Sequence, residues 1–351
     1  MVLSGQGVVV LDPAALRRLD RVTTLVVDAR LLSSQRWGIE RIEPRGAGSA
    51  HDCEVRTRAL FDPAAPLEPR RSGSWRLEPW AKDARAPRGT DAEARRLRRG
   101  GRKVLGLWRG ARLAALVSVV EEPEPLAEQL VDAAVEVGLE VVLAGGTDAL
   151  AERLGGLDRW PATQVAQDIQ IAQGSGQVVL YVSARAHAGL LASDVGVGVA
   201  LPGRRAPTGA DLVIQHGLGQ AWLLLEAVAR ARPVSERSAL LAVAGATSGA
   251  AWGMVGSPRT AAARIMLGIN ASAVASMVNG AAAGLGTAGA TIPLPPSRHR
   301  WHELSPSEVL DTVASSPSGL ELDEQLRRRV AEVARIATVR LGLGRAMWEE
   351  L

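Results

Sequence analysis

Between residues 22 and 28 the chain carries a mostly apolar, β-branched run that ends on one acidic residue, Asp28. A run without polar alternation is typical of a strand buried on both faces of a parallel sheet. The carboxyl ends of such strands are where α/β folds hold their chemistry. Asp28 is therefore a candidate nucleophile, and the alternative is that it only caps and solvates the end of the strand.

Regular alternation of strand and helix patterns resumes at residue 103 and continues to about residue 232. Strands are predicted at 104–108, 113–120, 139–143, 177–182 and 194–199. Apolar residues at helical spacing predict helices at 125–137 and 149–154. Alternation of this kind predicts an α/β domain with a parallel sheet, built from residues 1–35 and 101–232.

Residues 36–100 differ from both flanks because Pro, Gly, Ser and Arg interrupt every apolar run. The pattern predicts a largely irregular insert in the α/β domain, with one strand at 75–80. This stretch is also basic: residues 36–110 hold 18 basic and 10 acidic side chains, a net +8, whereas the whole chain is only +4.

Two uncharged segments, 239–255 and 265–285, approach the length of about 20 residues that spans a bilayer. Arginines flank the pair at 230, 232 and 237 and again at 298 and 300. This favours a membrane hairpin over residues 233–290 with both ends in the cytoplasm, although Arg259 and Arg264 in the connection weaken the charge argument. The alternative is a pair of buried helices in a soluble core.

The remaining composition excludes some classes of protein. Cys53 is the only cysteine among 351 residues, so an internal disulfide and a structural zinc site are both excluded. Residues 1–10 lack the cationic start and long apolar core of a signal peptide, so we expect none. The arginine-rich stretch 95–103 could grip nucleic-acid phosphates, but without interleaved aromatics we expect a solvated loop and no nucleic acid.

The segment ending at Asp28 resembles the strand of P-type cation-transporting ATPases that carries their phosphorylated aspartate, normally within Asp-Lys-Thr-Gly-Thr. Here the aspartate is followed by Ala29, Arg30, Leu31 and Leu32. The resemblance implies a haloacid-dehalogenase-like fold in which ATP and Mg²⁺ phosphorylate the aspartate. It also implies that residues 36–100 are a truncated copy of the nucleotide-binding domain that the family holds in this interval. Asp28 lacks the neighbours that supply electrostatic support, and such support is most of the catalysis in phosphoryl transfer.

Three further motifs of the family resemble segments of this chain with the chemistry replaced. The segment 138–147 resembles the strand ending in Thr-Gly-Asp, with Ala144 and Gly146 at the threonine and aspartate positions. Gln164 stands where the family has a phosphate-binding lysine. The segment 182–196 resembles the Gly-Asp-Gly-x-Asn-Asp loop, shortened and without its metal-binding aspartates; Arg185 and His187 occur there instead.

Other resemblances concern scaffold and flanks. Asp194 and Asp211 match aspartates that are structural in the family, so they support the fold alone. Residues 238–285 resemble the last membrane helix pair of the heavy-metal branch, without its Cys-Pro-Cys or an intramembrane carboxylate. The tail, 291–351, contains a capping box at Ser305 and resembles the amino-terminal segment of cation-transporting ATPases.

Together these features predict a fragment or degenerate half of a P-type cation-transporting ATPase. Asp28 is its vestigial phosphoacceptor position, with no bound cofactor and no metal expected. We expect a multi-pass plasma-membrane protein with cytoplasmic soluble parts, in contact with lipid and with the remaining parts of a transporter, in a structural or regulatory role. Two alternatives stay open: an active aspartyl phosphotransferase of the haloacid-dehalogenase-like class that uses Asp28, and a basic nucleic-acid-binding protein.

Overall fold

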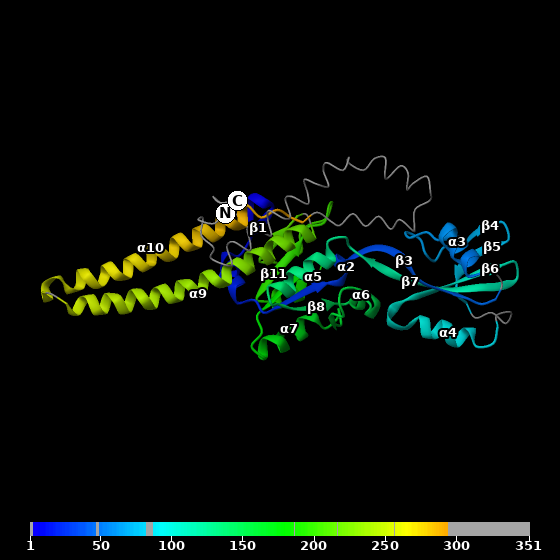
Figure 1. The fold of residues 1–351 in the computed structure, drawn as a ribbon, viewed down its shortest axis with the longest axis horizontal. Coiled ribbons are helices and arrows are strands. Elements are labelled where there is room, and N and C mark those ends of the chain that lie inside the picture. The colour runs from blue at the N-terminus through cyan, green and yellow to red at the C-terminus, as the bar shows by residue number, and fades with distance from the viewer. Residues whose placement is uncertain are drawn as a thin grey trace, which may run out of the picture. The chain divides into compact units, whose positions relative to one another are not determined.

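The predicted run at residues 22–27 forms an inner strand of a seven-stranded sheet (Figure 1). The computed structural model describes residues 3–46, 49–81, 87–185, 187–215, 217–255 and 257–293. The strand order is β1-β12-β11-β10-β2-β8-β9, and every neighbouring pair is parallel except β1 with β12. The strands are β1 (Val8–Val10), β2 (Thr24–Asp28), β8 (Glu140–Ala144), β9 (Asp158–Trp160), β10 (Val179–Ser183), β11 (Val195–Val199) and β12 (Leu212–Ile214).

Helices cover both faces of this sheet, which explains its unbroken apolar strands. Leu25 and Val27 of β2 face a core completed by α5 (Ala127–Glu136) and the first part of α9 (Leu218–Met254). Val26 faces the opposite core, which includes α7 (Val165–Gly174) and α8 (His187–Ala192). The predicted α/β architecture is confirmed here, and the predicted helices and parallel strands lie within about two residues of their observed bounds.

The second sheet is antiparallel, with strand order β3-β7-β6-β5-β4. Its strands are β3 (Ser33–Pro44), β4 (Arg70–Ser72), β5 (Trp75–Pro79), β6 (Lys103–Arg109) and β7 (Arg112–Pro123). One face packs on α3 (Ala50–Leu60), with Cys53 fully buried against the sheet, and the other packs on α4 (Thr90–Leu97). Trp80 and Trp108 stack on the α4 side with ring centroids 6.1 Å apart.

This sheet corrects two expectations. Residues 36–100 are not largely irregular, because they contain most of β3 together with α3, β4, β5 and α4. The boundary at residues 100 and 101 is also wrong, because β6 and β7 pair with β5 and β3 and not with the parallel sheet. Both are inner strands with a helix-covered core on each face, so their unbroken apolar runs match those of buried parallel strands.

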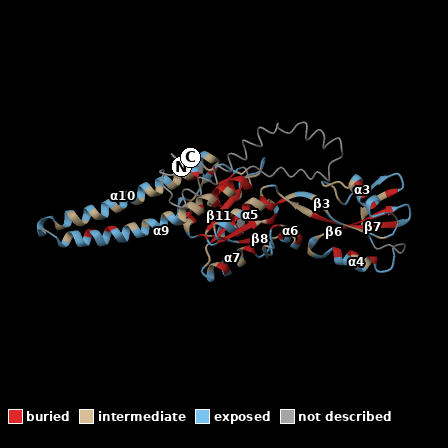
Figure 2. Cartoon of the chain, viewed as in Figure 1, coloured by how far each residue is buried: buried red, intermediate tan, exposed pale blue. Residues whose placement is uncertain are grey.

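Two long helices follow the parallel sheet: α9 and α10 (Ala261–Ala288), joined through η4 (Pro258–Thr260). The first part of α9 is buried on the sheet through residues such as Leu224 and Val228, whereas its last part and α10 are largely exposed (Figure 2). The predicted apolar segments lie in these exposed parts. The predicted tail falls outside the described residues after residue 293, Ser305 included.

Six further short helices occur in the described part of the chain. They are η1 (Leu3–Gln6), α1 (Pro13–Leu16), η2 (Leu19–Arg21), α2 (Ala29–Leu32), η3 (Arg99–Gly101) and α6 (Asp148–Arg153). Of these, α2 begins directly after β2 and α6 soon after β8, so both start at the carboxyl edge of the parallel sheet.

Candidate functional site

Asp28 lies at the carboxyl edge of the parallel sheet, where β2 ends. It pairs with Ala144, the last residue of β8. On the other side of β2, β10 ends at Ser183. This is the edge at which open α/β sheets bind ligands. The position of Asp28 in the sheet is thus the one that the sequence pattern predicts.

Both oxygens of the Asp28 carboxylate accept hydrogen bonds from within the chain. Oδ1 accepts from the backbone N–H of Arg30 at 3.1 Å, and Oδ2 accepts from the Ser183 hydroxyl at 3.0 Å. The first bond caps α2, because the opening turn of a helix leaves its N–H groups without intrahelical partners. The geometry therefore supports the capping alternative for Asp28.

A buried tyrosine that sequence reasoning missed lies next to this pair. Tyr181 precedes Ser183 by two residues on β10 and is 1% exposed. Burial raises the pKa of its hydroxyl to about 12; the negative charge of Asp28 adds to the rise, and a hydrogen bond with Ser183 opposes it. Residues two apart on a strand share a face, so the spacing of Tyr181 and Ser183 could have indicated their association.

The two-glycine turn after β8 is occupied by protein contacts. Gly145 and Gly146 both have positive φ angles, +81° and +72°. The N–H of Gly145 donates to the carbonyl of Trp160 at 2.8 Å. A Cβ on Gly146 would lie 2.7 Å from that of Ala29, so this position needs glycine for space as well as for φ. The Gly145 N–H is therefore not free to bind an anion, because the Trp160 carbonyl already accepts its hydrogen bond.

The position of the family's phosphate-binding lysine offers no charge. Gln164 is exposed and precedes α7. A nearby cation that sequence reasoning missed is Arg159 of β9, which donates to the Gly146 carbonyl at 2.5 Å and pairs with Asp148 at 2.7 Å. Arg159 thus fastens the glycine turn to the start of α6.

The loop after β10 contributes donors where the resemblance implies metal ligands. The backbone N–H of Arg185 donates to Ser183 Oγ at 3.2 Å, and the Arg185 side chain is exposed. The side chain of His187 lies outside the described residues. Mg²⁺ requires several hard oxygen ligands, and no three His, Cys, Asp or Glu side chains gather to hold a metal in the described part of the chain. The described residues at this edge do not fit a magnesium ion.

Two carboxylates at the amino edge of the same sheet accept backbone hydrogen bonds from neighbouring strands. Asp194 Oδ2 accepts from the N–H of Val179 at 2.8 Å and from the Gln173 side chain at 3.0 Å. Asp211 Oδ2 accepts from the N–H of Gly196 at 2.8 Å. Each aspartate therefore ties the start of its own strand to the start of the neighbouring strand.

The basic stretch 95–103 is occupied by intramolecular contacts. Arg96 pairs with Glu93 and Glu43, and Arg98 donates to the Trp80 carbonyl at 2.5 Å. Arg95 donates to the backbone of its own helix, and Lys103 lies 3.7 Å from the centre of a tryptophan ring. This geometry favours a structural role for the stretch.

Arg102 forms the most extensive of these contacts. Its guanidinium contacts Glu40 at 2.8 Å and Glu152 of α6 at 2.7 Å. The hydrogen bond from Arg102 lowers the pKa of Glu40, which also accepts from the Ser118 hydroxyl at 3.0 Å. Arg102 therefore joins the antiparallel sheet to α6, the helix between strands β8 and β9 of the parallel sheet.

The exposed parts of α9 and α10 pack through small residues, a signal that the sequence analysis missed. Gly245, Gly249 and Gly253 recur every four residues on α9. A Cβ on Gly249 would lie 2.9 Å from the Ile265 carbonyl oxygen, and one on Gly268 would lie 3.0 Å from Gly249 Cα. Such repeats allow close approach of helix backbones and are common between membrane helices.

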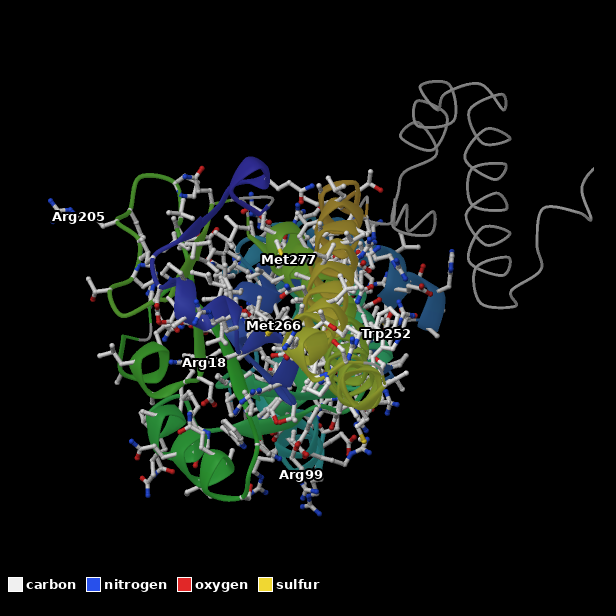
Figure 3. All side chains as sticks on the ribbon, turned by 90° about the vertical axis from the view of Figure 1, so that its left-hand side faces the viewer. Arg18, Arg99, Arg205, Trp252, Met266 and Met277 are labelled. Atoms are coloured by element: carbon white, nitrogen blue, oxygen red, sulfur yellow. The ribbon has the colours of Figure 1, made fainter. Side chains whose placement is uncertain are left out.

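One of the described helices, Pro258–Ala288, is long and apolar enough to cross a bilayer, judged by length and composition alone. None of its apolar stretch is buried against the rest of the protein. Figure 3 looks along the helix pair from its tip, with Trp252, Met266 and Met277 labelled; their exposed fractions are 53%, 52% and 75%. The other predicted segment, in α9, remains a prediction as a span.

Known proteins are similar to this chain in sequence over most of its length. No family model matches the chain. A probable cation-transporting ATPase I of Mycobacterium tuberculosis is 28% identical over 352 residues, which is 94% of this chain and 21% of the relative. The protein of the same name from Mycobacterium leprae is 26% identical over 354 residues, which is 95% of this chain and 22% of the relative. The chain thus spans about a fifth of the length of these relatives.

Two solved structures are also similar. One is a zinc-transporting PIB-type ATPase, with a TM-score of 0.48 and 14% identity over 77% of this chain and 52% of that chain. The other is the catalytic domain of the CPx-ATPase CopB-B, with a TM-score of 0.35 and 12% identity over 63% of this chain and 96% of that chain. The sequence comparisons agree with the motifs: this chain is similar to about a fifth of a probable cation-transporting ATPase.

Proposed function

We propose that the chain is part of a larger P-type cation-transporting ATPase. The parallel sheet would be its phosphorylation-like domain with a haloacid-dehalogenase-like fold, and the antiparallel sheet a shortened nucleotide-binding insert. Residues 233–290, which comprise the exposed part of α9 and α10, would form a membrane hairpin. Residues 291–351 would be the start of a further ATPase segment. The alignment of 94% of this chain with about a fifth of a cation-transporting ATPase supports the proposal.

In this proposal Asp28 does not accept a phosphoryl group, and the chain does not pump by itself. The observation that carries this step is the Asp28 carboxylate, which accepts an N–H of α2 and the Ser183 hydroxyl. Catalysis of phosphoryl transfer depends on cations aimed at the transferred group. Ala144, Gly146 and Gln164 stand at the supporting positions and supply neither charge nor metal ligands.

The function that follows is structural or regulatory support of a cation transporter in the plasma membrane. Helix α10 packs on α9, but its remaining apolar surface is exposed and would be unfavourable in water; a bilayer or other membrane helices would cover that surface. The soluble sheets would lie on the cytoplasmic side, near the arginines at the base of the hairpin.

Trapping of an acyl phosphate tests the first claim. The full chain in detergent is incubated with Mg²⁺ and labelled ATP, acetyl phosphate or inorganic phosphate, then quenched in acid and split with hydroxylamine. Wild type and Asp28→Asn are expected to give the same background. Hydroxylamine-sensitive label in the wild type that Asp28→Asn removes would overturn the claim and favour the active aspartyl phosphotransferase.

Membrane insertion is tested separately by carbonate extraction of expressing cells. The full chain is expected to stay with the membranes, and Val274→Arg, in the middle of the exposed stretch of α10, to weaken that retention, because a charge there is costly in hydrocarbon. Leu191→Arg is the matched control, since Leu191 is equally exposed but lies on α8. Extraction of the wild type, together with salt-dependent retention on DNA, would instead favour a soluble nucleic-acid binder.

A further inference from the structure

An open cavity of about 640 Å³ lies where the parallel sheet meets the base of the helix pair. Its walls come from the short helices α1 and η2, from the middle of α9 and from the last turns of α10. On α10 the cavity is lined by Gly280 and Gly284, which have no side chains to fill it. A Cβ at either glycine would meet nothing within 4 Å. The cavity therefore has room for an occupant that these helices do not supply.

The depth of the cavity along the helix pair follows from helix geometry, and this step rests on the proposed membrane hairpin. A hydrocarbon core of about 30 Å takes about 20 helical residues. Counting about 20 residues back from Met254, at the tip end of α9, reaches Val234. The same count from Ala261, at the tip end of α10, reaches residue 281. Val234 and Gly280 both line the cavity, so it lies at the level of the inner lipid headgroups.

The walls are chemically divided. Leu16, Leu19, Val234 and Ala283 form apolar surface, whereas Arg17 and Arg230 place guanidinium groups at the same cavity. Arginine is suited to phosphate because its donors form a fixed fork that can contact two oxygens. Arg230 also pairs with Glu226 at 3.2 Å.

An acidic residue at the cavity is held by the protein itself. Asp20 lines the cavity. Its Oδ2 accepts from the Ser235 hydroxyl at 2.6 Å, and its Oδ1 is buried. The buried oxygen is not open to an occupant and the other is bound to Ser235, so Asp20 joins η2 to α9 at the cavity wall.

We propose that this cavity binds one anionic phospholipid of the inner leaflet, such as phosphatidylglycerol. Arg17 and Arg230 hold the phosphate, and the first part of an acyl chain lies along the apolar wall. The lipid fills the space between the soluble sheet and the hairpin. Binding of this lipid would fix the hairpin base against η2 at the membrane surface.

The test uses the full chain purified from vesicles of equal parts phosphatidylglycerol and phosphatidylcholine, with retained lipids counted by native mass spectrometry. One phosphatidylglycerol is expected to be retained. Arg17→Gln with Arg230→Gln is expected to lower that retention about thirtyfold, since each arginine near an anionic headgroup contributes about 1 kcal/mol, or about fivefold. Gly284→Leu, which fills the cavity and leaves the charge unchanged, is expected to lower it as well. Arg204→Gln with Arg205→Gln, in an exposed loop outside the cavity (Figure 3), should leave retention unchanged.

Added glycerol 1-phosphate distinguishes a lipid site from a site for a soluble organophosphate. Retention of the lipid at millimolar glycerol 1-phosphate supports the proposal, and displacement would assign the cavity to the soluble compound. Equal retention of both lipids by the wild type, or loss only in the arginine variant, overturns a built lipid site. Carbonate resistance, measured on the same variants, reports the hairpin alone, so its loss in the wild type would overturn the membrane proposal itself.

Discussion

The two edges of the parallel sheet use aspartate in different ways. At the amino edge, Asp194 and Asp211 each accept a backbone N–H from the start of the neighbouring strand. At the carboxyl edge, Asp28 accepts from a helix N–H and a hydroxyl, and alanine, glycine and glutamine occupy the positions that the resemblance assigns to catalytic partners. The difference teaches that aspartate joins neighbouring strands at one edge of the sheet and caps a helix at the other.

The amino edge is expected to be the more sensitive of the two. Asp194→Ala removes two hydrogen bonds to a carboxylate and leaves the Val179 N–H without its acceptor, which is expected to lower the free energy of unfolding by about 2 to 3 kcal/mol. Denaturation of the full chain in detergent, with hydrogen exchange at β10, measures the loss. Asp194→Asn retains an amide oxygen and should lose less; an equal loss would contradict the hydrogen-bond explanation.

The second test concerns the buried hydroxyl of Tyr181, which lies near Asp28. The pKa of Tyr181 is raised in the folded protein from 10.0 to about 12. The neutral hydroxyl therefore makes its full contribution to stability below pH 10, and this contribution is lost as the pH rises through about 12. This rise in the pKa corresponds to about 2.7 kcal/mol of stability at the alkaline limit. Stability measured from pH 9 to 12 should fall more steeply for wild type than for Tyr181→Phe. Parallel profiles would contradict the burial of this hydroxyl.

At the carboxyl edge itself a smaller effect is expected. Asp28→Ala removes the cap of α2 and should cost about 1 kcal/mol, whereas Asp28→Asn can still cap and should cost a few tenths. The same denaturation measurement compares both variants with the Asp194 variants. A loss at Asp28 as large as that at Asp194 would break the contrast between the two edges.

The smallest effect is expected at a carboxylate outside the parallel sheet. Glu40 has a lowered pKa because Arg102 donates to it, so its contribution to stability is present above the unfolded pKa and is lost as the pH falls through the folded pKa. The pair is partly exposed, so we expect less than about 1 kcal/mol. Unfolding of Glu40→Gln and wild type should differ at neutral pH and converge as the pH falls through the lowered pKa of Glu40; a constant difference would exclude this origin.

Sequence reasoning recovered the parallel sheet well because its strands and helices alternate with short connections. The runs at 139–143 and 177–182 each lie within two residues of the observed strands β8 and β10. It failed where a pattern has two physical meanings. The runs at 104–108 and 113–120 are apolar because helices cover both faces of an antiparallel sheet, and a single sequence does not show which sheet they join.

The candidate site was predictable in position and not in its contacts. The residue that ends an apolar strand identifies Asp28, but the acceptor bond from Ser183 joins residues 155 positions apart and depends on which strands become neighbours. The same holds for the partners of the 95–103 arginines, since Glu43 and Glu152 are distant in sequence. Long-range pairing of polar groups is set by topology, which local patterns do not specify.

The uninterrupted course of α9 has a mechanical consequence. Its 37 residues form one rod about 55 Å long, anchored on the parallel sheet at one end and exposed at the other. A small rotation of the sheet is therefore amplified into a larger displacement at the tip of the hairpin. Pro233 lies between the anchored and exposed lengths and cannot donate a hydrogen bond to the turn before it. In the proposed hairpin, α9 can therefore bend at Pro233, where it enters the membrane.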